Sequence, residues 1–139
     1  MRGKSVHTLM AKAERALASA QSLLDMGDAD GACNRAYYAM FDAAPAALMA
    51  TDAPAGEGLG KTHRGLLNTF SAHLVKAGRV SKELGRQLKR AEESRWVADY
   101  DGSSIPMSDA AELVQQARQF VAAMQKLLVA AGQEPDQPN

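Results

Sequence analysis

The sequence predicts an all-α protein, an up-down antiparallel bundle of four to five helices. Alanine, leucine, methionine and glutamine are frequent, aromatic residues make up only 5% of the 139 residues, and runs of β-branched residues are missing. These residue types favour helix over strand. Apolar residues also recur at three- and four-residue steps between short breaks rich in glycine and proline, a pattern typical of amphipathic helices joined by turns.

The first two helices are predicted on either side of Gly27. Apolar residues at helical spacing indicate a helix over about 5–26, and glycine is a natural stop after it. A second helix is expected over about 28–44. Pro45 is expected to kink or end that helix, because proline lacks an amide donor and clashes with the preceding turn. Residues 46–51 can continue the helix beyond a kink.

The middle of the chain predicts a loop and two further helices. Residues 51–60 are rich in glycine and proline and carry no periodicity, which indicates a loop. A third helix is expected over about 62–76, with its end at Gly78. Ser81 can cap a fourth helix, which should fray near Tyr100.

The last helix and the tail complete one domain. Asp109 with Glu112 three residues later resembles a capping box, and the apolar residues that follow make an amphipathic helix. The segment beyond it is polar and rich in proline. We therefore predict a single domain over 1–131 and a disordered C-terminal tail over 132–139.

Charge and cysteine content restrict the class of protein. Lys and Arg number 16 and Asp and Glu number 16, so any contact with a polyanion must be a local patch. The single cysteine, Cys33, excludes an internal disulfide, and no His or Cys has metal-ligand spacing with another. No signal peptide or membrane span is apparent. We expect a cytoplasmic protein without membrane association, metal or cofactor.

The second helix carries polar residues within a small apolar run, ACNRAYYAMFDAA. At helical spacing Asn34, Tyr38 and Asp42 fall on one line, with Arg35 beside it. If these groups are buried, each needs a hydrogen-bond partner, because an unpaired one costs about 1–3 kcal/mol. The row indicates either a structural network between helices or a site that binds a phosphate or nucleotide.

The end of the fourth helix carries the second informative run, RAEESRWVADYDG. One more helical step along the apolar stripe formed by Leu84, Leu88 and Ala91 reaches Arg95. Glu92 and Asp99 lie three residues before and four after it, so an intrahelical ion-pair cluster is one interpretation. The other is that Arg95 holds a phosphate through its planar fork of donors, with Tyr100 and Asp101 nearby.

Together these runs resemble a HEPN domain of the prokaryotic branch whose second helix carries an Arg-x-Tyr-Tyr-Ala-Met-Phe motif. Here the motif is Arg35 and Tyr37 to Phe41, in the run RAYYAMF. The runs KTHRGLLNTFSAHLVKAG and RWVADYDG resemble the third helix and the end of the fourth helix of that branch. The resemblance spans about 10–128.

The resemblance implies a helical bundle that is commonly a dimer, and in many members a metal-independent ribonuclease. Such enzymes use an arginine followed after four to six residues by a histidine, which can move protons near neutral pH. Arg95 is instead followed by WVADYDG, without a histidine at that spacing. The candidate catalytic residues are therefore Arg95, Tyr100 and Asp101. The candidate phosphate- or nucleotide-binding residues are Asn34, Arg35, Tyr38, Asp42, His63 and Arg95.

Three functions remain open. Relatives of this branch are often paired with a minimal nucleotidyltransferase in a toxin-antitoxin or defence module. In some pairs the nucleotidyltransferase modifies a tyrosine near the arginine motif, which here is Tyr100. The alternatives are a ribonuclease that uses Arg95 with Tyr100, Asp101 or His63 as proton carrier, and a non-catalytic helical adaptor. The resemblance implies a homodimer, a nucleotidyltransferase partner, and RNA or a nucleotide as ligand.

Overall fold

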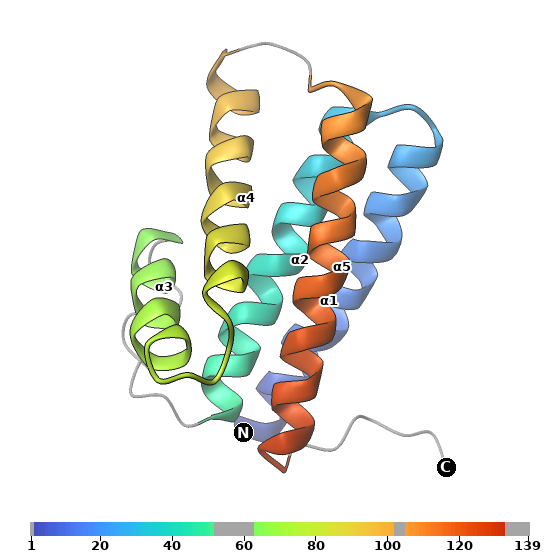
Figure 1. Cartoon of the computed structure of the whole chain (residues 1–139). Helices are drawn as coiled ribbons and strands as arrows, with labels where there is room; N and C mark the ends of the chain where they lie inside the picture. Colours follow the sequence, from blue (N-terminus) through green and yellow to red (C-terminus); the bar gives the residue numbers. More distant parts are fainter. Residues whose placement is uncertain (1, 52–62, 102–104, 133–139) are drawn as a thin grey trace, which may run out of the picture.

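The computed structural model describes residues 2–51, 63–101 and 105–132, with side chains described for 6–51, 64–93 and 105–132. The described part is all-α and holds no strand, as the sequence predicts (Figure 1). Its elements are α1 (Arg2–Asp25), α2 (Ala29–Ala50), α3 (His63–Phe70), the π-helical turn η1 (Ser71–Val75), α4 (Lys82–Asp101) and α5 (Met107–Ala130).

Helix α2 lies at the centre of the bundle and contacts every other helix. Helices α1 and α5 pack along one side of it, α4 lies on another side, and α3 lies beside α4 and contacts both α4 and α2 (Figure 1). Small residues make this close packing possible, because helix separation depends on the side chains at the contact. The buried alanines of α1 and α2 are Ala13, Ala16, Ala20, Ala32, Ala36, Ala39, Ala43, Ala44, Ala46, Ala47 and Ala50.

Three predicted helix boundaries are confirmed by backbone geometry or by capping hydrogen bonds. Gly27 follows α1 with a φ of 88°, a left-handed conformation that favours glycine. The Asp28 carboxylate caps α2 by accepting a hydrogen bond from the Gly31 amide at 2.9 Å. Ser81 caps α4 in the same way, because its hydroxyl accepts from the Leu84 amide at 3.3 Å.

At two other helix ends the structure narrows or corrects the prediction. The sequence predicts that Pro45 kinks or ends the second helix, but Pro45 does not end it, because α2 continues through Pro45 to Ala50. Residues 46–48 and Ala50 are buried, so tertiary packing of this last stretch outweighs the missing amide. Asp109 does not cap α5 either. Pro106 holds that position, and Asp109 lies in the first turn, where its charge favours the helix dipole.

The third predicted helix ends in a π-helical turn. The Lys76 amide donates to the Ser71 carbonyl at 2.9 Å, a five-residue step, and Gly78 follows with a φ of 78°. The predicted loop over 51–60 and the predicted tail over 132–139 lie almost wholly outside the described residues, so both stay predictions. In the part that is described, no helix is long and apolar enough to span a membrane.

Candidate functional site

The predicted polar row lies on one partly buried face of α2. Asn34 is exposed, whereas Arg35, Tyr38 and Asp42 are half-buried. The Arg35 guanidinium lies over the Tyr38 ring, 5.6 Å from its centroid, which is a cation–π contact. The row is therefore not a fully buried network, and its members combine one exposed amide with an arginine held against an aromatic ring.

Asp42 is the member of this row with altered acidity. Burial raises the pKa of its carboxyl above the usual value of 3.8, although the charges of Lys12 and Arg35 act in the opposite direction. Desolvation thus outweighs two nearby cations. A carboxyl in this state takes up a proton more readily than an exposed aspartate does.

Tyr37, which the sequence interpretation left out of the row, connects α2 to α4. It is fully buried, stacks on Phe41 with 4.5 Å between ring centroids, and meets the Tyr38 ring edge-on at 5.3 Å. Its hydroxyl donates a hydrogen bond to Glu92 Oε2 of α4 at 3.3 Å. A chain of contacts therefore runs from Arg35 through Tyr38 and Tyr37 to Glu92.

The turn of α4 that carries Arg95 follows directly after Glu92. Helices α2 and α4 run in opposite directions (Figure 1). Two hydrogen bonds fix how they align: Tyr37 donates to Glu92, and Asp30, near the start of α2, accepts from the Ile105 amide beyond the end of α4 at 2.9 Å. Arg95 lies three residues after Glu92 on α4, and Asn34 lies three residues before Tyr37 on α2. Because the helices are antiparallel, the backbones of Arg95 and Asn34 lie at the same level of the bundle.

Four predicted site residues cannot be placed by their side chains. Arg95, Tyr100 and Asp101 belong to α4 and His63 begins α3, but their side chains lie outside the described part of the chain. The predicted cleft between Arg95 and the α2 row therefore stays a prediction. The backbone brings the two segments to the same level of the bundle.

A second candidate region is a groove of about 410 Å³ between α3 and α4. Four of the ten residues that line it are basic and none is acidic. The sequence interpretation missed this groove. Its signal was present as lysine and arginine at four- and three-residue steps in α4, but nothing in the sequence showed that α3 packs opposite them. The lining residues are Arg64, Leu67, Asn68, Phe70, Ser71, Val75, Lys82, Gly85, Arg86 and Lys89.

Comparison with known proteins places this bundle in a family. Residues 6–127 match the HEPN domain model. A UPF0332 protein of Gloeobacter violaceus is 38% identical over 81% of this chain and 87% of its own length. A UPF0332 protein of Thermotoga maritima is 33% identical over 84% of this chain and 86% of its own.

Two further relatives, both from Methanocaldococcus jannaschii, carry the name "Putative toxin". One is 28% identical over 90% of each chain, and the other is 28% identical over 91% of this chain and 83% of its own. The family match covers almost the whole described bundle, including both runs of the sequence that carried the resemblance. The chain belongs to the HEPN domain family.

Proposed function

We propose that this protein is the HEPN component of a two-protein toxin-antitoxin or defence module, and that a minimal nucleotidyltransferase is its partner. The active surface is formed by the polar face of α2 and the Arg95 turn of α4, and it meets RNA or a nucleotide. The observation that carries the proposal is the contact chain from Arg35 through Tyr38 and Tyr37 to Glu92. It joins the motif helix to the turn before Arg95.

The residues after Arg95 favour a function that depends on a partner. A histidine at the usual spacing would supply a proton carrier near neutral pH, but the run WVADYDG has none. An arginine alone can hold a phosphate. Under this proposal the protein acts as a homodimer in the cytoplasm, as the family resemblance implies, and the nucleotidyltransferase controls it by binding it and modifying Tyr100.

Growth and association assays test this proposal. Expression of the chain alone should arrest growth, and co-expression of a minimal nucleotidyltransferase from the same genome should relieve the arrest and co-purify with the chain. Arg95→Ala should abolish the arrest. Arg90→Ala is the matched control, since Arg90 lies on the same helix and pairs with Glu83 in solvent. The proposal fails if growth is unaffected or if no nucleotidyltransferase associates.

A second candidate is a metal-independent ribonuclease in which Arg95 acts with Tyr100, Asp101 or His63 as the proton carrier. The antiparallel packing of α4 on α2, which brings the Arg95 backbone level with the start of the polar row, favours it. Purified protein should then cleave RNA in the presence of a chelator. Loss of cleavage in Tyr100→Phe, Asp101→Asn or His63→Gln would identify the proton carrier, and cleavage that persists in Arg95→Ala would indicate a contaminating nuclease.

A further inference from the structure

We propose that the groove between α3 and α4 is a binding site for the phosphate backbone of single-stranded RNA, separate from the polar face of α2. This inference rests on the proposed function, because it names where RNA is held outside the Arg95 turn. The charge of the groove, the spacing of its cations, the residues of its walls and the ion pair of Arg86 each support it.

The charge of the groove is the first argument. Arg64 of α3 faces Lys82, Arg86 and Lys89 of α4 across it, and no acidic residue belongs to the lining. The whole chain carries as many acidic as basic residues, so this is a local concentration of positive charge. Phosphates of nucleic acids bind such patches by displacing condensed counterions.

The spacing of the cations is the second argument. Lys82, Arg86 and Lys89 follow one another at four and three residues, so they lie on one face of α4, about 6 and 4.5 Å apart along its axis. A row of this kind meets a ligand whose negative charge repeats along one direction. A single phosphate or a small nucleotide would occupy only part of it.

The walls of the groove fit one strand of RNA. Leu67 and Val75 are partly buried and supply apolar surface for riboses or bases, while Asn68 and Ser71 supply hydrogen-bonding groups. Gly85 keeps the two walls close, since a Cβ there would meet Val75 Cγ2 at 3.1 Å. Because the two walls approach this closely at Gly85, we infer that the groove takes a single strand rather than a duplex.

The π-helical turn η1 contributes to the same wall. Ser71 and Val75 are its first and last residues, and both line the groove. Single π turns inside helices are energetically unfavourable and occur often at functional sites. Here the π-helical turn forms the end of the α3 wall, opposite Lys82 and Gly85 of α4.

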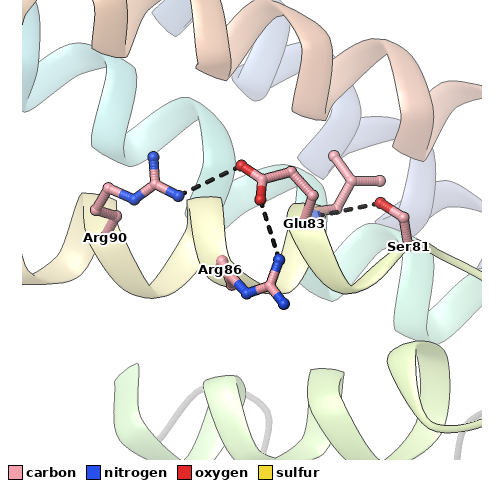
Figure 2. Close-up of polar contacts among 5 residues, drawn as sticks. Ser81, Glu83, Arg86 and Arg90 are labelled. Carbon is pink, nitrogen blue, oxygen red and sulfur yellow. Dashed lines mark hydrogen bonds and ion pairs between the residues drawn. The ribbon is translucent and has the colours of Figure 1, made fainter.

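One of the two arginines of the groove, Arg86, is already held in place by a weak ion pair. Glu83 binds Arg86 and Arg90, each at 3.3 Å, and Figure 2 shows Arg86 on the side of α4 that faces α3. The side chains of Arg86 and Glu83 are 64% and 51% exposed, so solvent screens their attraction. A phosphate can therefore displace Glu83 from Arg86 at little cost.

Salt-dependent binding of a short fluorescent oligouridylate to the purified full-length chain tests the site. Four phosphate contacts on a single strand predict that affinity falls about 50-fold between 50 and 200 mM salt. The variant R64Q/K89Q removes one cation from each wall and should reduce that fall to about 7-fold. The matched control R15Q/K126Q removes an exposed arginine and an exposed lysine from α1 and α5 and should keep the 50-fold dependence.

Each outcome decides the inference. Equal salt dependence in R64Q/K89Q and R15Q/K126Q overturns the inference. Binding of a polyglutamate peptide at the groove without binding of RNA also overturns it, because the groove would then be a protein-docking surface. If R64Q/K89Q fails to melt cooperatively, K82Q/K89Q replaces it, since both lysines are exposed. The RNA-binding assay measures neither growth arrest nor partner association, so a groove that binds no RNA does not contradict the proposed function. A chain that binds RNA there without arresting growth overturns only the proposed function.

Discussion

Replacing Tyr37 by phenylalanine removes one hydroxyl from the middle of the bundle and leaves the aromatic ring in place. The ring is fully buried and stacks on Phe41, so its packing should be preserved. What is lost is the hydrogen bond to Glu92. The variant therefore tests the hydrogen bond that Tyr37 of α2 donates to Glu92 of α4.

The expected loss can be worked out from the geometry. A hydrogen bond to a charged group contributes about 1.5–3 kcal/mol. The oxygen atoms here are 3.3 Å apart, longer than the 2.5–2.7 Å of strong bonds of this type, and Glu92 is only half-buried. We expect Tyr37→Phe to lower the free energy of unfolding by about 1 kcal/mol, which corresponds to a fall in Tm of about 3 °C for a domain of this size.

Urea denaturation of a double-mutant cycle measures the contact directly. The cycle combines Tyr37→Phe with Glu92→Ala, and it removes the contribution of other neighbours of either side chain. We expect a coupling free energy of about 1 kcal/mol. Growth arrest should weaken in Tyr37→Phe more than in a control destabilised to the same Tm, because the contact orients the Arg95 turn. A coupling near zero would refute the proposed connection between the motif helix and α4.

Four other substitutions or conditions give independent tests. Burial raises the pKa of Asp42, so its charged form lowers the stability of the fold above that pKa. Asp42→Asn should therefore raise Tm at pH 7, and this gain should disappear as the pH falls to the usual aspartate pKa of 3.8. Burial raises the pKa of the Cys33 thiol to about 11, so this thiol should react slowly with thiol reagents at pH 8. The contribution of the neutral thiol to Tm should be lost as the pH rises from 9.0 to 11. Gln87 is buried and its side-chain oxygen lacks a partner in the described part of the chain, so Gln87→Leu should raise the urea midpoint by an amount equivalent to about 1 kcal/mol. Glu83→Gln should tighten oligouridylate binding by releasing Arg86, whereas Glu112→Gln on α5 should leave it unchanged.

The helices could be predicted from the sequence because periodicity and capping are local. The stop at Gly27 and the cap at Ser81 each depend on residues a few positions away. The features that local patterns left open depended on distant parts of the chain. The buried residues after Pro45 keep α2 helical by packing, and no local pattern announces the π turn before Lys76.

The candidate site was predicted only in part, for a related reason. Helix α2 is buried on most of its surface, so the run Tyr37-Tyr38 does not reveal which ring faces the core. The polar row pointed to Tyr38, which is half-buried, while the contact with α4 is made by Tyr37. That choice depends on where α4 packs, which one helix alone cannot specify.

Core packing and the proposed ligand contact involve different side chains of this bundle. One core of alanines and larger apolar residues draws on every helix, including Phe70 of α3 and Leu88 of α4, so a substitution there acts mainly through folding. The walls formed by α3 and α4 instead carry an exposed ion pair, a π-helical turn and a row of cations along a groove. Charge variants on these walls can therefore change binding while the fold remains intact, which is why the groove offers a cleaner test of RNA contact than the half-buried face of α2.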